Sequence, residues 1–409
     1  MDAELRARFN DVWSESLARR AKRDVERRLH CQIPFRFAES PLFLSAQMVE
    51  RFENAANEIM EIISSDEFIA TQEKFVPAYV NGPDRGPLPQ FAVIDFAIVE
   101  EPDGSLAPRV VELQGFPSLY GFQIMLADVW ATSISRIDAM PNLWRIFFGG
   151  INRNRALALI DKALLNGHEP EEVVLLDLDV HFQKTYPDFA AIRHWFGIDH
   201  VAPRDLIRQG NQLFRDVGGQ RVRVRRVFQR IVMDELEKKR EVLGFGWNEE
   251  MDVEWAPHPA WYYLWSKSSM LEIDHPAVPK TTLLSELDPM PEDLTGYVLK
   301  PLYSFAGSGV NIDPTPEDLA AVPDDQLDQW VLQERIEYAP RLLMPDGTGV
   351  KCEVRMMFVR PDSDERMTLL HNLVRLSRGK MIGVDHNKDL AWTGASVAIW
   401  PFSDSGPNG

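Results

Sequence analysis

The chain has 409 residues, 45% apolar and 26% charged, which is typical of a globular protein large enough for two or three domains. Its formal net charge of −18 argues against nucleic acid or an anionic membrane as the main partner. The two cysteines, Cys31 and Cys352, have no metal-type spacing, so neither a disulfide framework nor a zinc site is indicated. The N-terminus lacks a signal-peptide pattern and no apolar run reaches transmembrane length, so we expect a cytoplasmic protein.

The chain begins with helical patterns. Residues 1 to about 30 are rich in Ala, Arg, Glu and Leu and favour one amphipathic helix, and residues 46–64 repeat apolar side chains at helical spacing. We therefore expect residues 1–75 to form an N-terminal helical region.

Two apolar strands with turn residues between them follow. Residues 91–99 are apolar except for Asp95, and residues 109–114 form the return strand. Glu112 and Gln114 are two apart and share one face, on which Asp95 of the neighbouring strand could also lie. Such oxygen-bearing side chains could hold Mg²⁺, which takes one or two carboxylates and completes its shell with water and phosphates. The alternative is a pair of partly exposed acids on an edge hairpin, although a charge in so apolar a run needs a partner.

The middle of the chain alternates strand and helix patterns. Apolar or alternating runs predict strands at 173–177, 198–201 and 222–228, and helical patterns lie at 189–197 and from 205. This alternation predicts a small parallel α/β unit. No G-x-G-x-x-G follows its first strand, so a nicotinamide site has no local support.

The stretch Tyr297–Val310 carries the strongest chemical signal. A short apolar strand delivers Lys300, and a loop of small residues follows, which includes Ser304, Gly307, Ser308 and Gly309. Small residues let backbone N–H groups approach an anion, and the lysine supplies a positive charge. The loop therefore suggests a phosphate cradle, although the order differs from that of a P-loop. The other interpretation is a hairpin turn with a chance lysine.

Three strand patterns close the chain, at 330–336, 351–359 and 368–377. The second places Glu353 and Arg355 on one face, and the third carries Arg375. The tail, residues 403–409, is small and polar, and we expect it to be disordered.

The loop and the strand after it resemble parts of the ATP-grasp superfamily. VLKPLYSFAGSGV looks like its phosphate-covering element, and WVLQERI looks like its hinge strand, whose backbone meets the adenine. The resemblance implies that Lys300 contacts ATP phosphates together with Lys267 or with Lys280, which lies in a VPKT segment. It also implies nucleotide contacts by Gln333, Glu334 and Ile336 of the hinge.

The family's metal motif, an Asp on one strand and Glu-x-Asn on the next, is absent from the C-terminal end. It matches VIDFAIVEEPDGSLAPRVVELQGFPSL near the N-terminal end, where Asp95, Glu112 and Gln114 take its three positions. This order is similar to that of the circularly permuted ATP-grasp proteins related to glutathionylspermidine synthase. Gln114 stands where the family usually has Asn, which lengthens the reach toward a metal ion.

The resemblance spans most of residues 90–400 and implies a circularly permuted ATP-grasp fold of the α+β or α/β class. VVLLDLD and RRVFQRI resemble the small parallel α/β domain, called pre-ATP-grasp, of such proteins. Nothing in residues 1–75 matches an accompanying amidase domain. The segments that we expect are an N-terminal helical region (1–75), the metal-binding hairpin part (76–150), the pre-ATP-grasp domain (151–245), the nucleotide-binding part (246–402) and the tail (403–409).

The implied reaction is the ATP- and Mg²⁺-dependent ligation of a small-molecule carboxylate to an amine through an acyl phosphate, with amino acids, peptides or polyamines as candidate substrates. Arg375 would stabilise the acyl phosphate, and Arg355 would orient the acidic substrate by a bidentate contact. Each arginine could instead form an ion pair with a neighbour such as Glu353. Two other functions stay open: a catalytically inactive ATP-binding regulatory protein, motivated by Gln114, and a phosphotransferase that acts on a hydroxyl group.

Overall fold

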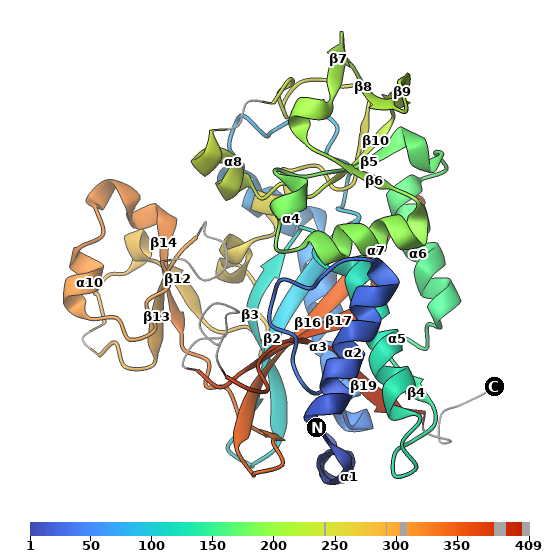
Figure 1. Cartoon of the computed structure of the whole chain (residues 1–409). Helices are drawn as coiled ribbons and strands as arrows, with labels where there is room; N and C mark the ends of the chain where they lie inside the picture. The colour runs from blue at the N-terminus through green and yellow to red at the C-terminus, as the bar shows by residue number, and fades with distance from the viewer. Residues whose placement is uncertain (241–242, 292, 303–308, 380–389, 403–409) are drawn as a thin grey trace.

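A computed structural model describes the whole chain except residues 241–242, 292, 303–308, 380–389 and 403–409 (Figure 1). Three parts make up the molecule: a central antiparallel sheet with helices, a parallel sheet at one end, and a small three-stranded sheet at one side. The fold is therefore mixed α+β, with several sheets. The expected disordered tail lies outside the described residues.

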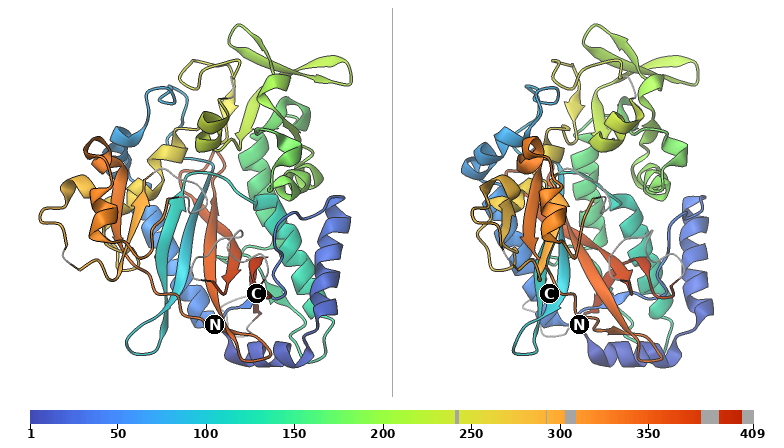
Figure 2. Two further views of the ribbon diagram at one scale, coloured as in Figure 1. Left: turned by 60° about the vertical axis from the view of Figure 1, so that its left-hand side comes forward. Right: turned by 90° about the vertical axis from the view of Figure 1, so that its left-hand side faces the viewer.

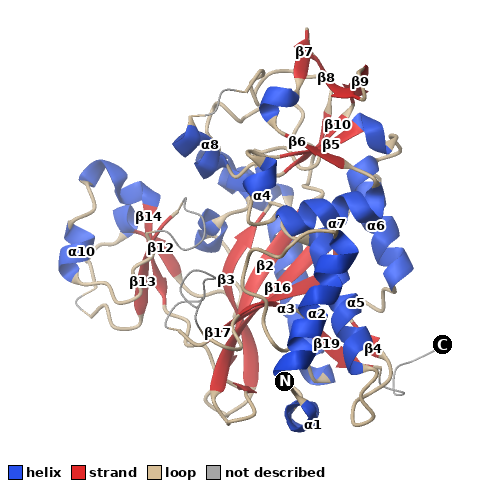
Figure 3. Cartoon of the chain, in the orientation of Figure 1, coloured by secondary structure: helices blue, strands red, loops and turns tan. Residues whose placement is uncertain are grey.

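The helices of the described part lie mainly in the first two thirds of the chain. They are α1 (Ala3–Val12), α2 (Glu15–Leu29), α3 (Ala46–Ile63), α4 (Asp66–Gln72), α5 (Tyr120–Ile134), α6 (Arg153–Leu165), α7 (Tyr186–Phe196), α8 (Met233–Lys239), α9 (Trp261–Leu264) and α10 (Pro316–Ala320). Helices α2, α5 and α7 pack against one another beside the central sheet (Figure 3). No described helix is long and apolar enough to cross a membrane.

The N-terminal region contains two helices where we expected one. Trp13 has extended backbone angles, and the Ser14 side chain accepts a hydrogen bond from the Leu17 N–H at 3.3 Å. A serine that caps a helix in this way begins a new helix. The expectation of a single helix over residues 1–30 is therefore wrong at this point.

The central sheet joins segments from both ends of the chain. Its strand order is β18 (Gly394–Ser396), β17 (Thr368–Ser377), β16 (Gly349–Val359), β2 (Phe91–Glu100) and β3 (Leu106–Gln114), and β15 (Leu342–Leu343) also pairs with β16. The expected hairpin of β2 and β3 is confirmed, with Asp95 opposite Glu112. Strand β16 runs antiparallel to β2 and places Arg355 opposite Asp95.

The two faces of the central sheet differ in chemistry. On one face, Phe52 of α3 meets Phe96 at 5.9 Å between ring centroids. Because side chains alternate along a strand, Asp95 points to the opposite face. Tyr120 of α5 contacts Phe91 on that second face, at 4.8 Å between ring centroids. The second face therefore carries the charged residues and is covered in part by the start of α5.

The parallel α/β unit that the sequence predicts is confirmed, but the single strand expected at 222–228 is wrong, because one strand ends at Val224 and another begins at Arg226. Its sheet has the order β11 (Glu254–Trp255), β10 (Arg226–Gln229), β5 (Val173–Leu176) and β6 (Asp199–Val201), and all three pairings are parallel. The helix expected from residue 205 is wrong, because residues 207–224 form an antiparallel sheet of β7 (Ile207–Gln209), β8 (Gln212–Val217) and β9 (Gln220–Val224). Turns at Gly210 and at Gly218 and Gly219, all with positive φ, connect these strands.

The small sheet has the order β12 (Thr281–Leu283), β14 (Trp330–Glu334) and β13 (Tyr297–Pro301). It lies on the side of the central sheet away from α2 (Figure 2). A short 3-10 helix, Lys267–Leu271, packs between β3 and β12 and so connects the two sheets. A third small sheet joins β1 (Leu42–Phe43), β19 (Ala398–Pro401) and β4 (Trp144–Arg145), and it brings the two ends of the described chain together.

Candidate active site

Four charged side chains form one network on the polar face of the central sheet. Arg355 donates to both carboxylate oxygens of Asp95, from Nε at 2.6 Å and from Nη2 at 2.7 Å. Arg375 of the next strand forms ion pairs with Asp95 and with Glu353. Tyr338 donates to Glu353 at 2.7 Å. Both arginines that we expected to contact substrate are therefore held by ion pairs within the sheet.

Asp95 is 1% exposed. Although burial raises the pKa of this carboxyl group, the guanidinium groups of Arg355 and Arg375 outweigh burial and hold the pKa below its usual value. Asp95 is therefore ionised, and both of its oxygens already accept hydrogen bonds. The expected magnesium contact of Asp95 would require that carboxylate to give up at least one of these bonds.

Glu112 and Gln114 differ from Asp95, because both are half-buried at the end of β3. Among the described residues, neither side chain has a hydrogen-bond or ion-pair partner. Gln114 lies opposite Val93, next to the Asp95–Glu112 pair. No cluster of three His, Cys, Asp or Glu side chains suited to a metal ion occurs in the described part of the chain. Glu112 and Gln114 could therefore offer one carboxylate and one amide oxygen to a cation.

Lys300 lies on β13 of the small sheet and points to the same region. Its ammonium group donates to Oε1 of Gln333 at 2.5 Å. Burial lowers the pKa of Lys300 to about 8, and the negative charge of Glu112 opposes that shift. A neighbouring positive charge, that of Lys267, lowers the pKa further. Lys300 therefore lies within electrostatic range of an acid from the other end of the chain.

The two remaining lysine candidates differ in position. Lys267 is 9% exposed, burial lowers its pKa, and the charge of Glu112 opposes that change. Lys280 is exposed, and its backbone N–H and C=O bond to Glu334 at the edge of the small sheet. The structure thus brings Lys267, and not Lys280, into the group formed by Lys300 and Glu112.

The expected nucleotide contacts are spread along β14 and the segment after it. Gln333 is buried, and its amide donates to the Thr281 hydroxyl at 2.8 Å while its oxygen accepts from Lys300. Glu334 is exposed, and Ile336 is half-buried in the segment that follows the strand. Their contacts with a nucleotide stay a prediction.

The loop after Lys300, in which we expect phosphate contacts, is described only at its ends. The expected contacts of Ser304, Gly307 and Ser308 lie outside the described residues. Gly309 has a φ of +76°, and a Cβ there would lie 3.1 Å from Pro301 Cγ. The return of the chain is antiparallel, because Leu299 and Asn311 exchange two backbone hydrogen bonds of 2.9 Å. Asn311 therefore lies opposite Leu299, the residue before Lys300.

One site residue, Arg230, was not expected from the sequence. It directly follows β10, at the carboxyl end of the parallel sheet, and is 3% exposed. Its Nε and Nη1 have no hydrogen-bond partner among the described residues. Burial lowers the pKa of Arg230, whereas the charges of Asp188 and Asp177 oppose the change and that of Arg355 adds to it. Arg230 therefore lies close to the charged face of the central sheet.

Asp177, which directly follows β5, is the neighbour of Arg230 at this edge. Its Oδ1 accepts from the Leu178 N–H at 2.7 Å, and the side chain is 3% exposed. Burial raises the pKa of Asp177 to about 7, against the lowering effect of Arg230. The only signal in the sequence was the position of each residue directly after a strand, the apolar VVLL before Asp177 and RVFQ before Arg230.

Comparison with known proteins shows which solved structures have a similar fold. No known protein family and no curated protein matches the sequence. Among solved structures, a glutathione synthetase like-effector from Globodera pallida, in its apo form, matches with a TM-score of 0.59. The two are 13% identical, and the match covers 94% of this chain and 96% of that chain. The chain has a glutathione synthetase-like fold.

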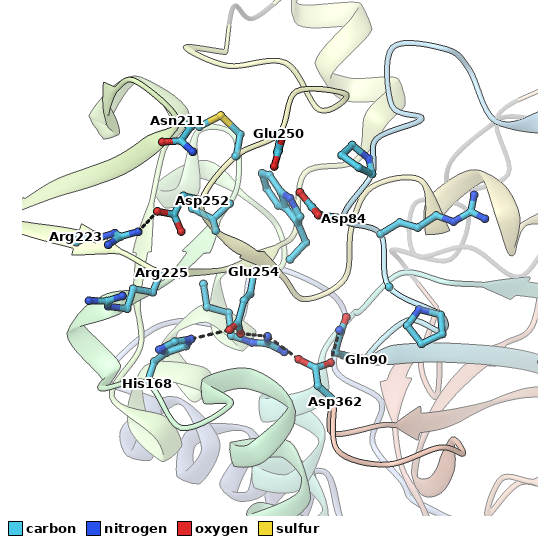
Figure 4. Close-up of a pocket in the computed structure, with 18 of the residues that line it drawn as sticks. Asp84, Gln90, His168, Asn211, Arg223, Arg225, Glu250, Asp252, Glu254 and Asp362 are labelled. Carbon is cyan, nitrogen blue, oxygen red and sulfur yellow. Dashed lines mark hydrogen bonds and ion pairs between the residues drawn. The ribbon is translucent and has the colours of Figure 1, made fainter.

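The protein also contains a cavity of about 710 Å³, which none of the site residues described above lines (Figure 4). It lies at the amino ends of the parallel strands, beside the segment that precedes β2. At its base the buried Arg226 forms ion pairs with Glu254 at 2.6 Å and with Asp362 at 2.7 Å. Asp362 also accepts from Gln90 at 2.6 Å. These bonds connect the parallel unit with the central sheet, and we assign them a structural role.

Proposed function

We propose that the protein is an ATP- and Mg²⁺-dependent carboxylate–amine ligase that forms ADP, built on a circularly permuted ATP-grasp fold. One observation carries the proposal: the charge of Glu112, from the front of the chain, acts on Lys300, Lys267 and Arg375 from its later part. An acid near three cations, with no direct ion pair to any described residue, is the arrangement that a metal-bound polyphosphate would complete. The glutathione synthetase-like fold supports a ligase.

Glu112 and Gln114 would hold the magnesium ion, since both are half-buried side chains with no other partner among the described residues. When bound, the ion would supply positive charge that neutralises the charge developing on the phosphates. The chain's own contribution is the placement of positive charge. Lys267 and Lys300 are partly removed from water, which strengthens their attraction for an anion.

Arg375 would contact the group that is transferred. Its Nη2 is occupied by Asp95 and Glu353, whereas its Nε is buried and has no partner among the described residues. This N–H would therefore be free to donate to an acyl phosphate oxygen. Attack of the amine nitrogen on the acyl carbon would then form the amide bond and release the phosphate.

The carboxylate substrate would bind at Arg230. Ligands of open parallel sheets bind at the carboxyl ends of the strands, and Arg230 and Asp177 follow two adjacent strands there. The two N–H groups of Arg230 that have no partner among the described residues suit a carboxylate, and Asp177 suits an ammonium group of the same molecule. An amino acid or a short peptide carries both groups, and we propose this class of substrate.

The test is an incubation of the purified protein with ATP, Mg²⁺ and pooled amino acids, peptides and polyamines. A ligase releases ADP and free phosphate only when both substrates are present. A phosphotransferase, the second candidate, would release ADP and a stable phosphorylated product, and an inactive nucleotide-binding protein would bind ATP without release of ADP. Absence of ADP with every pool, although ATP binds, would reject the ligase.

The lowered pKa of Lys300 predicts that kcat/KM depends on pH. Because Lys300 needs its charge to hold phosphate, kcat/KM should fall as the pH rises through about 8. Deprotonation of Lys300 does not itself destabilise the fold: its unfolded pKa is about 10.4, so the unfolded state binds more protons between these values and stability from this group rises with pH. The check is a pH–rate profile of the wild-type protein and of Lys300→Arg, in which the alkaline limb should move to higher pH. An identical limb in both proteins would assign it to another group.

The second prediction concerns the Mg²⁺ requirement of a Glu112 variant. Glu112→Ala should require at least about tenfold more Mg²⁺ for half-maximal ATP turnover, because one of two protein ligands is lost. The matched control is Glu101→Ala on the same hairpin, whose carboxylate pairs with Arg109 at 3.0 Å and should leave the Mg²⁺ titration unchanged. An unchanged titration in Glu112→Ala would remove Glu112 from the metal site.

A further inference from the structure

Asp95 takes the position of a metal ligand in the sequence pattern, but its contacts are those of a different role. Oδ1 accepts from Arg355 Nε at 2.6 Å, and Oδ2 accepts from Arg355 Nη2 at 2.7 Å and also from Arg375. The side chain is 1% exposed. A metal ligand must present an oxygen to an ion and its water, and here three N–H donors take those directions.

We infer that Asp95 is a positioning residue: it holds the guanidinium groups of Arg355 and Arg375 in place and does not bind the magnesium ion. The inference rests on the proposed ligase function. Arginine has many rotatable bonds, and fixing one before the substrate arrives removes an entropy cost from the reaction. Asp95 fixes two.

The contacts of Arg375 show how Asp95 orients a guanidinium group. Asp95 and Glu353 share its Nη2, and Glu353 is itself fixed by the Tyr338 hydroxyl at 2.7 Å. With one end of the guanidinium group held by two carboxylates, its Nε lies buried without a partner in the described part of the chain. The donor left unpaired is thus presented by a preorganised group, which is the arrangement that stabilises a developing negative charge.

The same geometry separates the roles of the two acids of the hairpin. Asp95 and Glu112 face each other across β2 and β3. Within the described part of the chain, however, the side chain of Asp95 bonds only to arginines and that of Glu112 bonds to no side chain. The first acid therefore holds the cations of the sheet, and the second is available to an ion. If Asp95 binds the metal ion, loss of its charge should weaken metal binding. If Asp95 positions the arginines, the same loss should lower turnover and leave metal binding unchanged.

The experiment measures metal binding and turnover separately in full-length Asp95→Asn. Binding of Mn²⁺ in the presence of a non-hydrolysable ATP analogue is followed by the electron paramagnetic resonance signal of free Mn²⁺, with Glu112→Ala as the reference for a lost ligand. We expect Asp95→Asn to bind Mn²⁺ within twofold of the wild type while kcat falls at least tenfold. A Mn²⁺ affinity reduced tenfold, as in Glu112→Ala, would overturn the inference.

A mutant cycle tests whether Asp95 acts through the two arginines. If it does, Asp95→Asn should change kcat less than twofold in an Arg355→Met/Arg375→Met background, since both groups that it positions are already absent. A further tenfold loss in that background would also overturn the inference.

Loss of one partner of a buried ion pair can unfold a protein. If Asp95→Asn does not fold, the double variant Asp95→Asn/Arg355→Met removes both partners, and its Mn²⁺ affinity is judged by the same limits. The proposed function is tested independently, by ATP turnover in the wild type: an inactive wild type that still binds Mn²⁺ with the analogue would reject the ligase, and the metal-binding comparison would still decide the role of Asp95.

Discussion

Replacing Lys300 by alanine is expected to abolish ATP turnover and to leave the protein folded. A cation placed at a transition-state oxyanion contributes about 3–4 kcal/mol, so kcat should fall by roughly 10²–10³. The fold should tolerate the change, because burial disfavours the charged form of this side chain and its ammonium bonds, among the described residues, to Gln333. Turnover is measured as ADP release, and folding by circular dichroism and thermal unfolding.

Lys280→Ala is the matched control, because Lys280 is an exposed lysine of the same small sheet. Its turnover should stay within about twofold of the wild type, since surface lysines of this kind contribute little. Lys267→Ala should resemble Lys300→Ala, because Lys267 lies in the electrostatic group of Glu112. Normal turnover in Lys300→Ala would refute the assignment of the phosphate site.

Replacing Asp188 by alanine is expected to lower the free energy of unfolding by about 4 kcal/mol. Its Oδ1 accepts from the N–H groups of Gly121 at 2.9 Å and Phe122 at 3.0 Å, and its Oδ2 accepts from that of Leu119 at 3.0 Å. The alanine variant leaves three N–H groups at the start of α5 unpaired, and it also removes a negative charge that acts on the buried Arg230.

Urea unfolding followed by circular dichroism measures this change. The control is Asp11→Ala, an exposed acid near the end of α1 that should change the stability by less than about 0.5 kcal/mol. A loss below about 1 kcal/mol in Asp188→Ala would show that water or the backbone satisfies the start of α5 in its absence.

Much of the local structure could be predicted from the sequence. The hairpin of β2 and β3 follows from two apolar runs and the turn residues between them, and the parallel strands follow from short apolar runs with helices between them. These predictions succeed because side-chain alternation and turn chemistry act over a few residues. They failed where the local signal is ambiguous, at Ser14, which begins a second helix, and at residue 205, which opens a small antiparallel sheet.

The candidate site was harder to predict, because a charged residue in the sequence does not indicate which residue it pairs with in the folded chain. An acid in the run FAVIDFAIV indicates a buried partner, but the sequence does not say that Arg355 and Arg375 supply it. The choice between Lys267 and Lys280 was open for the same reason. Arg230 belongs to no recognised motif. It is identified by its position after β10 and by two N–H groups that have no partner in the part of the chain that the structure describes.

Sequence alone was sufficient for most of the elements, for the acids of the hairpin and for the lysine that precedes the small-residue loop, since each depends on neighbours along the chain. The tertiary structure alone decided which charges meet. Glu112 and Lys300 lie far apart in sequence, and their proximity depends on the pairing of β2 with β16 and on the packing of the 3-10 helix Lys267–Leu271 between two sheets. Electrostatic interactions act through space, so the partner of a charged group is known only when the chain is folded.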